Sequence, residues 1–109
     1  MPFRLTAALA AITLTLVMAS SATARTMYVT STAYCLRGTM ANGRGVHYGA
    51  VAMNILPLGK RIRTNRSPFG RHRRFRVEDR IGWGTQLDFW VPSCGMAYAW
   101  GRRTVRVRY

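Results

Sequence analysis

The sequence predicts a small, mainly β protein: a closed barrel of six short strands with one short helix. Three observations support this fold class. Short runs rich in β-branched and aromatic residues alternate with glycine- and proline-containing turns, one segment carries helix-capping signals, and the chain ends in a strictly alternating strand over Val105–Tyr109. Closing the strands into a barrel would leave no exposed sheet edges.

The N-terminal segment predicts export from the cytoplasm. Met1–Arg4 is a short positive start, Leu5–Met18 carries no charged residue, and a run of small residues then ends in an Ala-x-Ala pattern at Ala24. The alternative is a membrane anchor, but the apolar run is shorter than the roughly 20 residues a helix needs to cross a bilayer. We therefore expect a signal peptide over residues 1–24, cleaved after Ala24. The remaining chain, residues 25–109, should be one secreted domain at the cell wall or outside the cell, without stable membrane insertion.

Strand and turn signals succeed one another through this domain. The expected elements are a strand over Met27–Tyr34, a glycine-rich loop over Gly38–Gly49, an apolar strand within Val46–Met53, a turn at Pro57–Gly59, a half-exposed strand over Lys60–Thr64, a basic loop over Asn65–Arg74, a strand at Phe75–Val77 and a strand over Thr85–Trp90. On the last strand, Leu87 and Phe89 share one face and Asp88 lies on the other, because side chains alternate. Asp88 should therefore point towards a cavity or groove.

The one expected helix spans Cys94–Trp100. Ser93 follows Pro92 and is a suitable N-cap, because its hydroxyl can accept a hydrogen bond from the first turn. Gly101 suits the position at which helices commonly end in a left-handed residue.

Cys35 and Cys94 predict a disulfide, because export would place both in an oxidising compartment. The alternatives are a metal pair or a catalytic thiol. Isolated cysteines without CxxC spacing are poor zinc ligands, and no base for a cysteine nucleophile is identifiable. The bond would close most of the domain into one loop, which contributes about 4 kcal/mol in the chain-entropy model.

The charge is strongly basic. Seventeen lysines and arginines face three acidic residues, giving a formal net charge of +14 at pH 7. Such a surface binds polyanions with an affinity that falls as salt rises. For an exported protein we expect peptidoglycan and anionic cell-wall polymers rather than nucleic acid, and we assign polyanion binding to Arg71, Arg73 and Arg74 in the basic loop. A solvated basic face without a particular partner remains the alternative.

Several motifs follow one another in a characteristic order. They are Thr32-Ala33-Tyr34 with Gly38–Gly43, Gly49–Asn54 with Leu56–Gly59, Val77–Arg80 with Gly82, Gln86–Trp90, and Ala97 with Trp100–Arg103. This order resembles the 3D domain, a small double-psi β-barrel named for three aspartates. That domain is found in bacterial cell-wall proteins and at the core of the membrane-bound lytic transglycosylase A family. The resemblance implies a six-stranded double-psi barrel. One departure is that Asn54 stands at the best match for the first aspartate.

The other two family aspartates match Asp79 and Asp88, two of the three acidic residues in the chain. The resemblance implies that Asp88 is the catalytic acid and base. It would protonate the bond between muramic acid and glucosamine, then deprotonate the C6 hydroxyl as a 1,6-anhydro ring closes. Asp79 is the second catalytic candidate, and a hydrolase would use both carboxylates. Either aspartate could instead pair with a cation. The cations lower an acid's pKa, so only desolvation, by Trp83, Phe89 or Trp90, could raise that of Asp88.

Four further residues are predicted to contact substrate. Thr39 and Tyr34 lie in the matched opening motif, Asn54 replaces the first aspartate, and Trp83 lies in a Gly-Trp-Gly loop of the kind that carries ligand contacts. The alternative for any aromatic residue is packing in the core. No metal-binding constellation, phosphate-binding loop or Ser/His/Asp grouping occurs, so neither metal nor cofactor is predicted, and we expect a monomer.

The sequence thus predicts a secreted cell-wall protein that acts on peptidoglycan glycan strands, with lytic cleavage as the first hypothesis. A non-catalytic wall-binding module, as in the expansin-like relatives of this barrel, is the second. A cationic membrane-active protein is the third.

Overall fold

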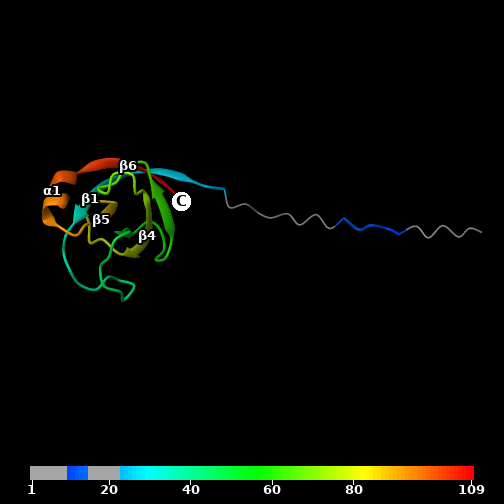
Figure 1. Cartoon of the computed structure of the whole chain (residues 1–109), viewed down its shortest axis with the longest axis horizontal. Coiled ribbons are helices and arrows are strands. Elements are labelled where there is room, and N and C mark those ends of the chain that lie inside the picture. The colour runs from blue at the N-terminus through cyan, green and yellow to red at the C-terminus, as the bar shows by residue number, and fades with distance from the viewer. Residues whose placement is uncertain (1–9, 15–22) are drawn as a thin grey trace, which may run out of the picture.

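The computed structural model describes residues 10–14 and 23–109. Residues 26–108 form a closed β-barrel of six strands with one short helix (Figure 1). The elements in chain order are β1 (Thr26–Tyr34), β2 (Ala50–Ala52), β3 (Arg61–Thr64), β4 (Arg74–Asp79), β5 (Leu87–Trp90), α1 (Cys94–Trp100) and β6 (Arg103–Arg108). Around the barrel the strands follow the order β1-β5-β2-β4-β3-β6. The predicted mainly β barrel with one helix is confirmed.

The predicted signal peptide falls for the most part outside the described residues. Among the residues that are described, no helix is long and apolar enough to cross a membrane.

Two strand pairs are parallel, β1 with β5 and β2 with β4, and the other four pairs are antiparallel. Alternation along each strand sends one set of side chains into the barrel. Phe89 lies at the centre of this core, with its ring 4.9 Å from that of Phe75 and 5.5 Å from that of Trp100. Burying an apolar side chain of this size contributes about 1.5–3 kcal/mol, so this cluster holds β4, β5 and α1 together.

The helix begins and ends where its capping residues predict. The Ser93 hydroxyl accepts a hydrogen bond from the Met96 amide at 3.3 Å, and Gly101 ends the helix with a φ of 63°. Trp100, buried on the inner side of the helix, donates from its indole nitrogen to the Ser31 hydroxyl at 3.2 Å. The helix is thereby fixed to β1.

The helix has the predicted bounds, whereas all six strands differ from the predicted ones: β1 begins one residue earlier, β3 one residue later and β5 two residues later, and the other three differ more. β2 is only Ala50–Ala52, because a turn that ends at Gly49, with a φ of 88°, precedes it. β4 begins at Arg74 instead of Phe75 and continues through Asp79, because Arg74 pairs with Arg63 of β3. β6 begins two residues before the predicted strand, at Arg103, where it pairs with Ser31 of β1.

Candidate functional site

Four strands bring Asp79 and Asp88 into one row on the outside of the barrel. Asp88 is in register with Thr32 of β1 on one side and with Ala52 of β2 on the other, and Ala52 is in register with Asp79 of β4. Neighbouring strands lie about 4.8 Å apart, so the Cα atoms of the two aspartates are about 10 Å apart, with the small Ala52 side chain between them. Asp88 points outward because the residues on either side of it belong to the core.

Asp88 is partly buried and makes one hydrogen bond to the described residues, accepted from the Thr32 hydroxyl at 3.1 Å. Burial raises the pKa of Asp88 to about 6; the Thr32 hydrogen bond acts to lower it, and the negative charge of Asp79 acts to raise it. Desolvation therefore outweighs the Thr32 hydrogen bond in setting the pKa of this carboxyl. Trp83 cannot contribute to that desolvation, since it is 91% exposed.

One oxygen of the Asp79 carboxylate accepts two backbone hydrogen bonds. Its Oδ1 atom accepts hydrogen bonds from the Ala41 amide at 2.9 Å and from the Arg80 amide at 2.8 Å. Asp79 thereby ties the loop between β1 and β2, residues 35–49, to the turn that follows β4. We call the loop between β1 and β2, residues 35–49, the covering loop.

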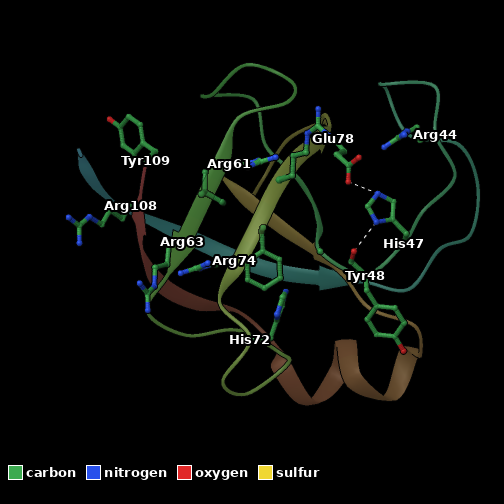
Figure 2. Close-up of a pocket in the computed structure, with 14 residues that line it drawn as sticks. Arg44, His47, Tyr48, Arg61, Arg63, His72, Arg74, Glu78, Arg108 and Tyr109 are labelled. Carbon is green, nitrogen blue, oxygen red and sulfur yellow. Dashed lines mark hydrogen bonds and ion pairs between the residues drawn. The ribbon is translucent and has the colours of Figure 1, made fainter. Parts of the chain in front are cut away.

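Sequence reasoning gave Glu78 no role, yet it is the most deeply buried carboxylate of the site, at 1% exposed. Its Oε1 atom accepts from the Asn42 side chain at 3.0 Å (donor Nδ2), and its Oε2 atom lies 2.5 Å from His47 Nε2 (Figure 2). Apart from this ion-pair contact, Oε2 has no hydrogen-bond partner among the described residues. The other His47 ring nitrogen, Nδ1, lies 2.8 Å from the Tyr48 carbonyl oxygen.

A bulge brings the side chains of Glu78 and Asp79 to the same side of β4. Val77 pairs with Val51 and Asp79 pairs with Ala52, so Glu78 is an extra residue on β4. Simple alternation would place the side chains of Glu78 and Asp79 on opposite faces of the strand. The bulge instead lets both contact the covering loop. The one available signal was composition, since two of only three acidic residues in the chain are adjacent here.

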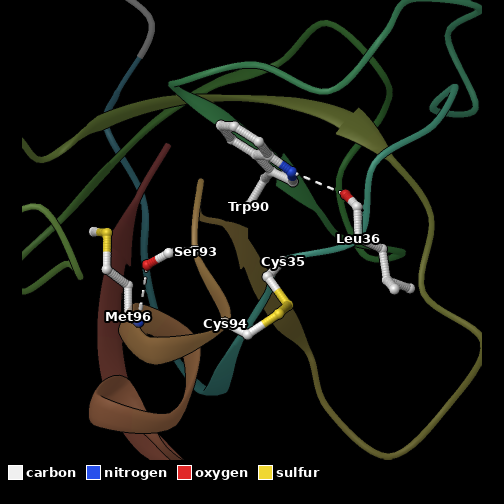
Figure 3. Close-up of a disulfide and its surroundings, with 6 residues drawn as sticks. All are labelled: Cys35, Leu36, Trp90, Ser93, Cys94 and Met96. Atoms are coloured by element: carbon white, nitrogen blue, oxygen red, sulfur yellow. Dashed lines mark hydrogen bonds between the residues drawn. A yellow bond between two sulfur atoms is a disulfide. The ribbon is translucent and has the colours of Figure 1, made fainter.

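The covering loop contacts β5 and β4. Met40, at its centre, is only 3% exposed, and the Trp90 indole donates to the Leu36 carbonyl at 3.0 Å (Figure 3). The predicted disulfide between Cys35 and Cys94 is confirmed, with 5.0 Å between the Cα atoms. It joins the start of the covering loop to the start of α1.

Tyr34 and Thr39 differ in how close they lie to the carboxylates. The Tyr34 hydroxyl is buried without a hydrogen-bond partner in the described part of the chain. Burial raises its pKa above the ordinary value, and the charges of Asp79, Asp88 and Glu78 raise it further, so the hydroxyl keeps its proton near them. Thr39 is exposed and pairs with Gly45 inside the covering loop.

Asn54 and Trp83 lie outside the row. The Asn54 side chain accepts from the Ile81 amide at 2.9 Å and donates to the Ile81 carbonyl at 2.7 Å, so both ends of its amide hold the turn after β4. Trp83 lies in the loop between β4 and β5, almost fully exposed to solvent.

The three predicted polyanion-binding arginines are exposed but do not share one surface hollow. Arg74 lines a groove of about 670 Å³, which includes Glu78 but neither Asp79 nor Asp88. Arg73 lines a smaller neighbouring hollow with Arg106, and Arg71 lines neither.

Within residues 10–14 and 23–109, no group of three His, Cys, Asp or Glu side chains is placed to hold a metal ion. A scan against protein-family models finds no match for this chain, and a search of curated proteins finds no significant relative.

Proposed function

We propose that this chain is an exported cell-wall protein in which Asp88 serves as both acid and base in the lytic cleavage of peptidoglycan glycan strands. The observation that carries the proposal is the difference between the site's carboxylates. Asp79 is engaged by two backbone amides, and Glu78 by Asn42 and His47. Asp88 has one hydroxyl partner and a pKa raised to about 6 by burial, so it can exchange a proton near neutral pH.

Lytic cleavage needs only one carboxyl group, because the nucleophile belongs to the substrate. Neutral Asp88 donates its proton to the glycosidic oxygen as the bond from that oxygen to the muramic acid C1 breaks. The resulting carboxylate accepts the proton of the C6 hydroxyl as O6 bonds to C1. The Thr32 hydroxyl stabilises the carboxylate between the two steps. Hydrolysis would require a second carboxylate, and one oxygen of Asp79 already accepts two backbone amides.

The proposed compartment is supported by the disulfide. Such bonds persist in oxidising environments outside the cytoplasm, and Cys35 and Cys94 form one here. Export agrees with the charge pattern of the N-terminal segment, and the basic surface suits anionic wall polymers.

The test is the release of anhydromuropeptides from purified peptidoglycan. The unmodified protein should release them, and Asp88→Asn, which keeps the side chain's size, should reduce release to background. Thr32→Val should move the fall in rate above pH 6 to higher pH, because the carboxylate loses its stabilising hydrogen bond. Circular dichroism of each variant checks that the fold is intact. The catalytic proposal fails if the unmodified protein releases no anhydro product.

A non-catalytic wall-binding module is the second candidate, and one observation favours it. The groove of about 670 Å³ is lined by neither Asp79 nor Asp88. Such a module would sediment with insoluble peptidoglycan and leave its turbidity unchanged, whereas an enzyme would clear it. Asp88→Asn would bind as well as the unmodified protein.

A further inference from the structure

Strands β4, β3 and β6 carry a block of outward-facing arginines that we call the arginine ladder. Its members are Arg61, Arg63, Arg74, Arg76 and Arg108. Arg63 is directly opposite Arg74 on one side and Arg108 on the other, and Arg61 is opposite Arg76. Neighbours across strands are about 4.8 Å apart and neighbours along a strand about 6.8 Å apart at the backbone, so five cations share a small area.

The ladder has no internal counterions. Among the described residues, no side chain of the ladder makes a hydrogen bond or ion pair, whereas the side chains of Arg80, Arg102 and Arg103 all donate to backbone carbonyls. Like charges directly opposite one another destabilise a sheet. The ladder therefore combines unused guanidinium donors with a repulsion that a bound anion would relieve.

The ladder forms one wall of the groove of about 670 Å³ (Figure 2). All five ladder residues line this groove, together with aromatic side chains that include Tyr48, His72 and Tyr109. Along β4, the outer face changes from Arg74 and Arg76 to Glu78 at the bulge. An anion would therefore be attracted to one end of the groove and repelled from the end at Glu78.

We propose that the arginine ladder and its groove are a second binding site, separate from Asp88, for a linear polymer of alternating phosphate and polyol or sugar units. The planar guanidinium fork matches the oxygens of a phosphate, and all the ladder cations are arginine. The aromatic residues of the groove offer contacts for the units between phosphates. A concave groove accommodates a chain, whereas a lipid bilayer presents a broad surface that cannot enter it. This inference extends beyond the proposed function, since it requires no catalysis by Asp88.

The experiment titrates fluorescently labelled poly(glycerol phosphate) with the protein and follows fluorescence anisotropy. A triple ladder variant, Arg61→Gln/Arg63→Gln/Arg74→Gln, is compared with a control that loses the same charge, Arg25→Gln/Arg37→Gln/Arg66→Gln. None of the control positions lines the groove. Three lost phosphate contacts should lower affinity roughly 100-fold at about 0.1 M salt and reduce the slope of log affinity against log salt by about 2. The control should change affinity only a few-fold.

Equal losses in the two triple variants would overturn the proposal, because net charge alone would then explain binding. Tighter binding of a single-stranded oligonucleotide, of phosphatidylglycerol vesicles or of polyglutamate than of poly(glycerol phosphate) would also overturn it, by pointing to a nucleic acid, a membrane or a carboxylate polymer.

Arg63→Gln alone should give an intermediate loss of affinity. The ladder variant should melt at no lower a temperature than the unmodified protein, because repulsion between the arginines is removed. Asp88→Asn should bind poly(glycerol phosphate) as tightly as the unmodified protein, because Asp88 does not line the groove, and this separates the inference from the proposal for Asp88.

Discussion

At the scale of single residues, the two aspartates of the row have opposite relations to stability. Asp79 accepts two backbone hydrogen bonds, which tie the covering loop to the turn after β4. Asp88 is partly desolvated with one hydroxyl donor, and its pKa is raised to about 6. The charged form of Asp88 therefore destabilises the fold, whereas Asp79 stabilises the covering loop. We expect this arrangement where one of two acids has a functional role.

This contrast predicts a pH-dependent change in stability for Asp88→Asn. Folding raises the pKa of Asp88 from its ordinary value of 3.8 to about 6, so the folded state binds this proton more tightly than the unfolded state. The resulting contribution to stability is complete below pH 3.8 and is lost as the pH rises to about 6. At pH 7 the Asp88→Asn variant carries a neutral side chain, so it does not lose stability through burial of a charged carboxylate. Because Asp88 is only partly buried, solvent screening reduces the full linkage value, and we expect Asp88→Asn to be more stable by about 1–2 kcal/mol. Urea unfolding at pH 7 and near pH 4 measures the difference.

Asp79→Asn is the matched control, and its expected effect has the opposite sign. The neutral amide oxygen is a weaker acceptor for the Ala41 and Arg80 amides, so stability at pH 7 should fall by about 1–2 kcal/mol. An Asp88→Asn protein that is less stable than the unmodified chain at pH 7 would show that Asp88 is not desolvated in the fold.

At the scale of elements, the covering loop is held against β4 by side chains that the bulge presents. Glu78 reaches both Asn42 and His47, which lie at separate points of the loop. Removing one partner of a buried charged contact leaves the other uncompensated. The contact between Glu78 and His47 is therefore expected to couple β4 to the loop.

A double-mutant cycle tests this coupling. Glu78→Gln keeps the size of the side chain and its contact to Asn42, but it loses the charged contact to His47 and should cost about 1–3 kcal/mol. His47→Gln should cost less after Glu78→Gln than alone, giving a coupling of about 1 kcal/mol in urea unfolding. Hydrogen exchange at the Met40 amide, which donates to the Arg44 carbonyl, should accelerate in Glu78→Gln. Additive effects of the two substitutions would exclude the coupling.

At the scale of the whole molecule, the sequence predicts the barrel well because its signals are local. Alternation places Leu87 and Phe89 in the core, and the capping residues predict the bounds of α1. The site is harder to predict because it depends on register between strands distant in sequence. Thr32, Ala52 and Asp88 are brought together by pairing, and a bulge that no local pattern marks turns Asp79 towards the covering loop beside Glu78.

The same dependence on pairing between distant strands explains why the arginine ladder and the role of Asn54 are not predicted from the sequence. The sequence predicts an excess of arginine and a basic loop, but alternating arginines such as Arg61 and Arg63 form a continuous surface only once β3 lies between β4 and β6. The role of Asn54 could not be anticipated either. Its partner, Ile81, lies 27 residues away, across a turn whose geometry follows from the barrel.

The disulfide acts on the molecule as a whole. Cys35 and Cys94 are 59 residues apart, so their bond restricts most of the unfolded domain. Replacing both by serine should cost about 4 kcal/mol in the chain-entropy model and lower the melting temperature by roughly 15–30 °C for a domain of this size. Differential scanning calorimetry measures the change, and the reduced unmodified protein should melt close to the double variant. A decrease of only a few degrees would mean that the barrel is stable without the bond.

This measurement also bears on the compartment in which the protein works. A small domain buries a limited core, so the loss of about 4 kcal/mol is a large part of its stability. The bond also anchors the start of the covering loop, through Cys35, which directly follows Tyr34 at the end of β1. Reduction of the disulfide should therefore unfold much of the protein at growth temperature. In the molecules that stay folded, it should make the covering loop and the carboxylate row more mobile. A reduced protein that stays folded and keeps its activity would remove the structural reason to place the protein outside the cytoplasm.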